Sequence, residues 1–250
     1  MSEGNPTGEQ NSAREQFPQT RWSVVLAACD ESDAGGAAVA LESLCRAYWF
    51  PLYVYIRRRG HSPEDAEDLT QGYFAALIER DYLSQADRTK GRLRSFLLTT
   101  LKHFLADEWS KAGAQKRGAG KIIMSIDAAQ AEERYALEPA DEASPDVLYE
   151  RRWALTVLDN VLDTLRQEYV TSGKTELFNV LQKFLAWNSA GTAYRETAAQ
   201  LNMKESAVRV AIFRLRRRYG DLLREAVAAT VTSPDEVPGE LDYLLSLLKS

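Results

Sequence analysis

The sequence has few of the residues on which most metal sites, disulfides and hydrolytic active sites depend. Only two cysteines, Cys29 and Cys45, and two histidines, His61 and His103, occur in 250 residues. The cysteines form no C-x-x-C pair and have no histidine at metal-ligand spacing, so neither a disulfide framework nor a zinc site is suggested. Two histidines also leave little from which a Ser/His/Asp or Cys/His set could be assembled. We therefore expect no cofactor and no metal, and we predict that the chain is not an enzyme.

Long apolar runs are also missing. No stretch of the sequence approaches the ~20 apolar residues that a membrane-spanning helix requires. The first residues, MSEGNPTGEQNSAREQ, are polar and include acids, without the basic and apolar regions of a secretory signal. The stretch GAQKRGAGKI is superficially similar to a phosphate-binding loop, but Gln115 and Ile122 stand where that motif requires Gly and Ser or Thr. We expect a cytoplasmic protein with no membrane partner.

Positive charge is not in excess, because the net charge is −5. The charges are nevertheless segregated along the chain. Segment 88–118 has eight basic residues against two acidic ones, and segment 195–224 has eight against three. Segments 119–146 and 232–250 are acidic, with net charges of −5 and −3. This pattern indicates two basic modules, of the kind that contact nucleic acids, separated by acidic connectors.

Apolar residues recur with helical spacing along almost the whole chain, and no convincing alternating strand pattern occurs. One helix is predicted to begin at Ser62, which can cap it ahead of Pro63. Trp153 and Leu165 are placed on another helix, in the second half of the chain. Between these two helices, the three glycines of KAGAQKRGAGK and the two prolines of LEPADEASPD indicate a linker. We predict an all-α fold of two helical domains joined by an acidic linker, the C-terminal domain containing a helix-turn-helix. The predicted parts are a flexible N-terminal tail (1–20), a first domain (21–118), the linker (119–146), a second domain (147–231) and an amphipathic C-terminal extension (232–250).

The segment RETAAQLNMKESAVRVAIFRLRRRYG predicts a helix, a tight turn and a second helix, the arrangement found in DNA-binding proteins. The short helix covers Tyr194 to Leu201 and the long one Ser206 to about Ala228. Asn202 stands in the turn, where a residue that tolerates a positive φ is needed. The alternative interpretation is a plain charged helical hairpin.

The long helix has a core-facing side and an opposite side of unusual composition. Val208, Ile212 and Leu215 point in one direction at 100° per residue, and this side faces the core. An exposed Val and Phe beside arginines suit a major groove, where apolar groups contact thymine methyls and Arg contacts guanine or phosphate. The residues predicted to bind DNA here are Ser206, Arg209, Val210, Phe213, Arg214 and Arg217.

The stretches HSPEDAEDLTQGYFAAL and GRLRSFLLTTLKHFLADEWSKAGAQKR closely resemble domain 2 of the extracytoplasmic-function sigma factors, bacterial initiation factors that have only domains 2 and 4. An acidic D-x-E-D-L-x-Q-x-x-F helix is matched from Asp65 to Phe74, and an R-S-[FW]-L stretch from Arg94 to Leu97. The helix-turn-helix then resembles their domain 4. The resemblance covers about 37–118 and 153–231.

This resemblance implies a function and a set of site residues. Core RNA polymerase would bind the acidic helix through Asp65, Asp68 and Gln71. The −10 promoter element would be held and opened by Arg92, Arg94, Lys102 and His103, with the loop 84–90 as a pocket for an unstacked base. The helix-turn-helix would bind the −35 element of the promoter DNA. Phe104 and Trp109 are candidates for base stacking, although helical aromatics are more often core.

Two alternatives stay open at this level. The chain could instead be a helix-turn-helix transcriptional regulator that is not a polymerase subunit. An anti-sigma factor or another regulator is a further partner that the family resemblance allows. Two residues also depart from the family pattern, because Gly72 lies in the middle of the acidic helix and Lys204 replaces the usual Ser or Thr cap, which Ser206 could supply with a shifted start.

The C-terminal extension PDEVPGELDYLLSLLKS predicts a short acidic helix with an apolar stripe that includes Leu241, Leu244, Leu245 and Leu248. So short a helix is marginal alone in water and must bury its leucines. Three readings follow from this. The helix is extra core for the second domain, or it packs across both domains and brings its acids close to the basic surfaces, or it binds a regulator.

Overall fold

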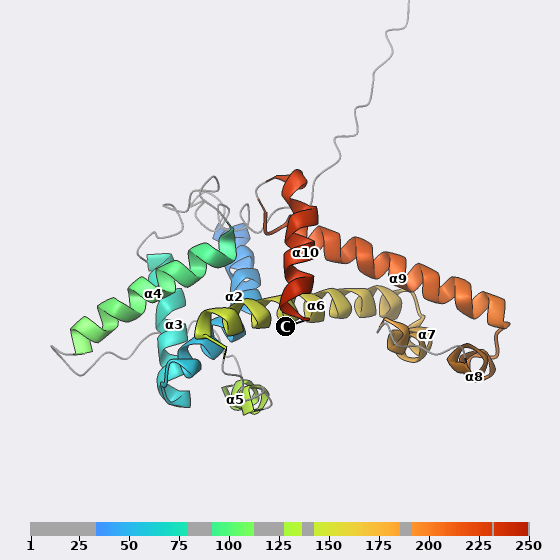
Figure 1. Cartoon of the computed structure of the whole chain (residues 1–250), viewed down its shortest axis with the longest axis horizontal. Helices are drawn as coiled ribbons and strands as arrows, with labels where there is room; N and C mark the ends of the chain where they lie inside the picture. Colours follow the sequence, from blue (N-terminus) through green and yellow to red (C-terminus); the bar gives the residue numbers. More distant parts are fainter. Residues whose placement is uncertain are drawn as a thin grey trace, which may run out of the picture.

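The computed structural model describes residues 34–79, 92–112, 128–136, 143–185, 192–231 and 233–249. Within these ranges every regular element is a helix and none is a strand, which confirms the predicted all-α fold class. The helices form an elongated molecule with α2, α3 and α4 toward one end and α7 and α8 toward the other (Figure 1). The predicted tail 1–20 and loop 84–90 lie outside the described residues.

The first helical group consists of α2 (Ala34–Arg58), α3 (Pro63–Glu79) and α4 (Leu93–Ala112). Side chains of α2 are buried on all sides between 47 and 56, because α3 packs against one side of the helix and α6 against another. The core of this group is rich in aromatic rings, such as the stacked pair Trp49 and Tyr53, with ring centroids 5.1 Å apart.

Helix α3 begins as the sequence predicts and contacts α4 closely. The Ser62 hydroxyl accepts a hydrogen bond from the backbone N–H of Asp65 at 3.1 Å, so the expected cap is present. A Cβ at Gly72 would lie 3.4 Å from Phe104 Cζ, and the glycine therefore marks the point where α4 approaches α3. One residue further along, the Tyr73 hydroxyl donates to the Leu97 carbonyl at 2.9 Å.

Helix α6 (Pro145–Thr171) is 27 residues long and contributes to both hydrophobic cores. Its first half places Trp153 and Val157 against the first helical group. Its second half places Val161 and Leu165 in a second core, which α9 shares. The predicted boundary at 146/147 therefore does not divide the packing, because Trp153, expected in the second domain, is buried in the first core.

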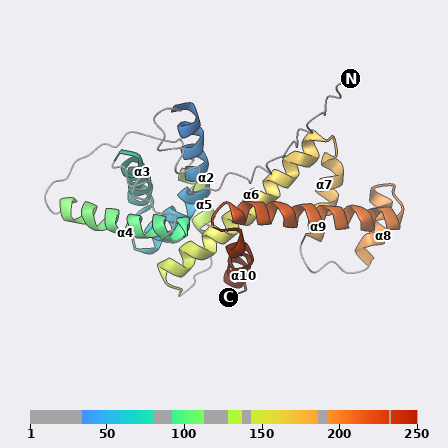
Figure 2. The ribbon, with the colours of Figure 1, turned by 90° about the horizontal axis from the view of Figure 1, so that it is seen from above.

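The second helical group is formed by α7 (Thr175–Leu181), the short helix η2 (Gln182–Phe184), α8 (Thr192–Gln200) and α9 (Glu205–Ala228). Helices α7 and α9 pack against α6, and α8 packs against α9. Figure 2 shows α6 and α9 crossing near the middle of the molecule. Large apolar side chains fill this core, namely Phe178, Leu181, Phe184, Val208, Ile212 and Leu215.

Part of the predicted linker is a helix that packs on the first group. Helix α5 (Ala128–Ala136) carries Glu132, whose carboxylate accepts hydrogen bonds from Tyr53 at 2.5 Å and from Arg57 Nη2 at 2.8 Å. The ring of Tyr135 lies 4.7 Å from the guanidinium carbon of Arg57. The acidic segment 119–146 is therefore not all linker, since 128–136 is anchored to α2.

The C-terminal extension folds as η3 (Pro234–Glu236) and α10 (Val237–Leu247). Helix α10 packs against both α6 and α9 and stands at the junction of the two helical groups (Figures 1 and 2). Leu244 is fully buried, as the predicted stripe requires, whereas Leu245 is exposed. A charged residue that the apolar pattern did not include, Glu240, is also fully buried.

Candidate nucleic-acid and partner surfaces

The turn between α8 and α9 has the backbone geometry expected from the sequence. Asn202 has a φ of +51°, the one described residue other than glycine with a positive φ. The backbone N–H of Met203 donates to the Ala198 carbonyl at 2.9 Å and closes the turn. Lys204 precedes α9 in an extended conformation without a side-chain cap, and the helix begins at Glu205. The suggested cap by Ser206 is therefore not observed.

The face of α9 opposite the core is exposed and mixes apolar with cationic side chains. Val208, Ile212 and Leu215 are buried beneath it. On the other side Phe213 is 66% exposed and Val210 is 49% exposed, values that few large apolar residues reach in the described part of the chain. All six residues predicted to bind DNA on this helix are exposed, namely Ser206, Arg209, Val210, Phe213, Arg214 and Arg217. We call these six residues the α9 face.

The arginines of the RLRRR run divide into two kinds. Arg216 donates to the Phe184 carbonyl at 2.8 Å, and Arg218 forms an ion pair with Glu168 at 2.6 Å. The hydrogen bond from Arg218 lowers the pKa of Glu168. Within the described ranges no ion pair involves Arg214 or Arg217. Two arginines of the run therefore hold α9 against its neighbours, and the other two project into solvent.

Arg209 belongs to the α9 face but is oriented by its neighbours. Its guanidinium pairs with Glu205 one helical turn earlier, at 2.7 Å. It also lies 4.7 Å from the centroid of the Tyr194 ring on α8. These contacts fix the side chain along the line between α8 and α9.

The acidic side of α3 is available to a partner. Asp65 and Asp68 are exposed, while Ala66 and Leu77 on the opposite side are buried. Gln71 is partly exposed, and its amide donates to the Glu67 carboxylate at 3.1 Å. The three residues predicted to bind polymerase therefore lie at the surface of one helix.

The C-terminal half of α4 presents cationic and aromatic groups around a surface pocket of about 340 Å³. Its lining comes from the α2–α3 corner and from α4, namely Arg59, His61, Lys102, Leu105, Ala106, Trp109 and Ser110. Trp109 is 72% exposed, whereas Phe104 is buried in the core. Of the two stacking candidates, only Trp109 is accessible. Lys102 pairs with Asp146, and His103 is exposed.

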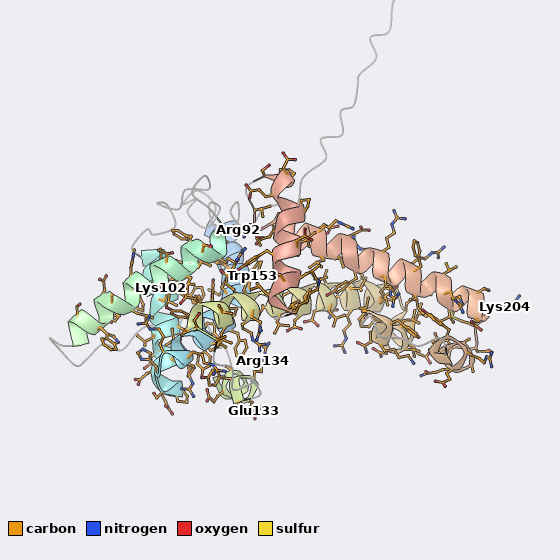
Figure 3. All side chains as sticks on the ribbon, viewed as in Figure 1. Arg92, Lys102, Glu133, Arg134, Trp153 and Lys204 are labelled. Atoms are coloured by element: carbon orange, nitrogen blue, oxygen red, sulfur yellow. The ribbon has the colours of Figure 1, made fainter. Side chains whose placement is uncertain are left out.

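The start of α4 differs from the sequence prediction. Arg94 is only 2% exposed, and in this conformation it cannot contact DNA. Its guanidinium pairs with Glu150 of α6 at 2.5 Å and with Glu240 of α10. Arg92 pairs with the same Glu240, with Nε 3.0 Å from Oε2. Figure 3 shows Arg92 at the end of α4 that lies beside α10, with Trp153 below it.

Sequence reasoning missed Glu150, Glu240 and Tyr243, the residues that cover these arginines. Tyr243 lies on α10 with its ring centroid 4.8 Å from the Arg94 guanidinium carbon. A signal was present, because Glu240 stands four residues before Leu244, on the apolar side of the predicted helix. Spacing alone could not identify its partner Arg94, which lies 146 residues away along the chain.

In the ranges that the structure covers, no helix is long and apolar enough to cross a membrane, and no group of three metal-binding side chains occurs. Burial raises the pKa of the Cys45 thiol to about 12, so it stays protonated at neutral pH and is a poor nucleophile. Cys29 lies outside the described residues.

Comparisons with known proteins give no further guide. The chain matches no protein-family model, no curated protein and no solved structure. The family resemblance of the two sequence stretches therefore stays a prediction.

Proposed function

We propose that this chain is a bacterial transcription initiation factor of the extracytoplasmic-function sigma type, which binds core RNA polymerase and directs it to promoters. The observation that carries the proposal is the α9 face. Exposing Phe213 and Val210 to water sacrifices the free energy that their burial would supply, about 1.5–3 kcal/mol for each side chain. Arg214 and Arg217 on this face form no ion pair within the described residues. The face is therefore suited to a polyanion that carries methyl groups in its groove, as DNA does.

In this proposal α8 and α9 form a helix-turn-helix, and α9 enters the major groove of the −35 element. The turn at Asn202 sets the angle between the two helices, and Arg216 and Arg218 brace α9 from behind. Arg214 and Arg217 are then free to contact phosphates or guanine edges. The apolar pair Val210 and Phe213 would contact thymine methyl groups.

The first helical group supplies the other two contacts of the proposal. The acidic side of α3, with Asp65, Asp68 and Gln71, would bind core polymerase. The pocket on α4 would receive the opened −10 strand, because an exposed Trp109 offers a stacking surface for a base and Arg59 offers charge to phosphates. Lys102 would add its charge on exchanging Asp146 for a phosphate. All of these side chains are at least partly exposed, which supports the proposed contacts.

A reconstitution experiment tests the proposed function. The purified full chain is added to bacterial core RNA polymerase, and transcription is measured from a library of promoter sequences. The proposal expects transcripts that begin at defined sites and depend on the added chain. Sequence-specific DNA binding without any stimulation of core polymerase would contradict it and favour a helix-turn-helix regulator that is not a polymerase subunit.

A pair of charge reversals sharpens the test of polymerase binding. Asp68→Arg should weaken affinity for core polymerase by about tenfold or more, since like charges placed opposite each other at an interface are strongly unfavourable. Asp163→Arg makes the same change at an exposed position of α6 and serves as the control. Equal affinities of the two variants for core polymerase would show that α3 is not part of the interface.

A further inference from the structure

Two side chains of opposite charge are buried together where the C-terminal helix meets the first helical group. Arg94 is 2% exposed and Glu240 is fully buried. Burying an isolated charge is strongly unfavourable, so each needs an oppositely charged partner. The contact joins the first turn of α4 to α10, and it is among the longest-range ion pairs in the described residues.

Aromatic rings surround this buried pair. The Arg94 guanidinium carbon lies 4.4 Å from the ring centroid of Trp153 and 4.8 Å from that of Tyr243. Arg92 and Glu150 complete the cluster, which we call the latch: Arg92, Arg94, Glu150, Glu240 and Tyr243, with Trp153 beneath. Two arginines and two glutamates make its formal charge zero while α10 is in place.

Helix α10 is short, and most of its side chains are exposed or only partly buried where it packs against α6 and α9. It has eleven residues, a length at which an isolated helix is marginal in water. Leu244 and Glu240 are its buried side chains, and Leu245 is exposed. The Leu247 carbonyl accepts a hydrogen bond from Arg151 at 3.2 Å. Such an element can open as a unit without unfolding the rest of the chain. If it opens, the latch loses Glu240 and carries a net positive charge.

We propose that Arg92 and Arg94 form an anion site for a phosphate of single-stranded DNA, and that Glu240 occupies this site in the free chain as an internal competitor. A carboxylate held by two guanidinium groups occupies the position in which a phosphodiester would place its two free oxygens. Helix α10 therefore closes the site, and its release opens it. The inference rests on the proposed function, in which the start of α4 contacts the opened strand.

The test measures the affinity of the full chain for a labelled mixed-sequence 20-nucleotide single strand of DNA, without polymerase. Glu240→Gln keeps the shape of the side chain but removes its charge. It should raise the affinity by about tenfold and make the dependence on log salt steeper by about 0.7 for each phosphate gained. Asp242→Asn removes the same charge from an exposed position of α10 and should change neither quantity.

A double variant assigns the gain to the arginine site. Arg92 is partly exposed, so Arg92→Gln should be tolerated. Added to Glu240→Gln, it should remove most of the gained affinity. Amide hydrogen exchange in α10 and in the first turn of α4 should be faster in the Glu240→Gln variant than in the unsubstituted chain. The Asp242→Asn variant should show no such rise. Faster exchange without a gain in affinity would overturn the proposal, as would an equal gain from Asp242→Asn.

A second variant covers the case in which Glu240→Gln does not fold. Tyr243→Ser removes an aromatic wall of the latch without placing an unpaired charge in the core, and it should raise the affinity in the same direction. Unchanged affinity in folded Tyr243→Ser, with α10 opened, contradicts the proposal. Neither polymerase nor a promoter enters this test, so a chain that starts no transcription can still show the gain, and a functioning initiation factor can fail to show it.

Discussion

The two arginine groups of this chain have the same residue type and opposite surroundings. On α9, Arg214 and Arg217 project from an exposed face whose other side contributes to the core. At the start of α4, Arg94 is buried between two carboxylates, and Arg92 shares one of them. Both groups were expected to bind DNA. Only the first is available in this conformation, because the second is covered by a helix from the other end of the chain.

Helical periodicity predicts which side of a helix faces the core, but it does not predict whether a distant segment covers the other side. Periodicity relates a side chain to the core beneath its own helix, which is a local property. Whether a distant segment covers the outer side is decided by tertiary packing. For α9 no described segment lies over the exposed face, and for α4 the acidic end of α10 does.

The two arginine groups should differ most in what they contribute to the stability of the fold. Arg94→Met should lower the free energy of unfolding by about 3–5 kcal/mol, because it takes a buried partner from the fully buried Glu240 and from the partly buried Glu150. Arg217→Met should change it by less than about 0.5 kcal/mol, as expected for an exposed position. Urea unfolding at neutral pH measures both. Equal losses would mean that the two arginine groups do not differ in burial.

A DNA-binding measurement tests the exposed arginines of α9. Arg217→Ala should change discrimination among −35 variants by about 1–3 kcal/mol if the guanidinium makes a bidentate base contact. Arg224→Ala, further along α9 and paired with Asp221, is the control. Uniformly weaker binding to all variants would make Arg217 a phosphate contact and assign base reading to Arg209, Val210 or Phe213.

The turn that presents the α9 face should tolerate glycine but not a branched side chain. Asn202 has a φ of +51°. Asn202→Val should lower the free energy of unfolding by about 1–2 kcal/mol, because a left-handed backbone brings Cβ too close to the following carbonyl. Asn202→Gly should have a small effect. If Val and Gly prove equivalent in thermal unfolding, the turn is not constrained as described.

The carboxylates of the two regions should respond to pH with opposite signs. The hydrogen bond from Arg218 lowers the pKa of Glu168, so this pair stabilises the fold above the ordinary value of 4.5 and ceases to do so as pH falls through the lowered pKa. Burial raises the pKa of Glu150, so its ionisation makes the folded state less stable as pH rises through 4.5.

Two conservative variants measure this contrast by urea unfolding across pH. Glu168→Gln should lose about 0.5 kcal/mol at pH 7, since the pair is well exposed, and the loss should vanish in acid. Glu150→Gln should reduce the fall in stability that accompanies rising pH. Parallel pH profiles for the two variants would show that the sites do not differ.

Local signals in the sequence were sufficient for much of the fold. Ser62 caps α3, Asn202 forms the turn with positive φ, and the buried side of α9 follows from its spacing. Gly72 was identified as unusual without its reason, which is the approach of Phe104. The docking of α5 and of α10 could not be predicted, because Glu132 and Glu240 find their arginines only after the chain has folded.

Reaction of the free full chain with phenylglyoxal, followed residue by residue by mass spectrometry, tests most directly whether one arginine group is open and the other closed. The reagent modifies guanidinium groups that it can reach. We predict that Arg214 and Arg217 react rapidly and that Arg94 is protected for as long as α10 stays in place. Modification of Arg94 at the rate of Arg217 would contradict this prediction.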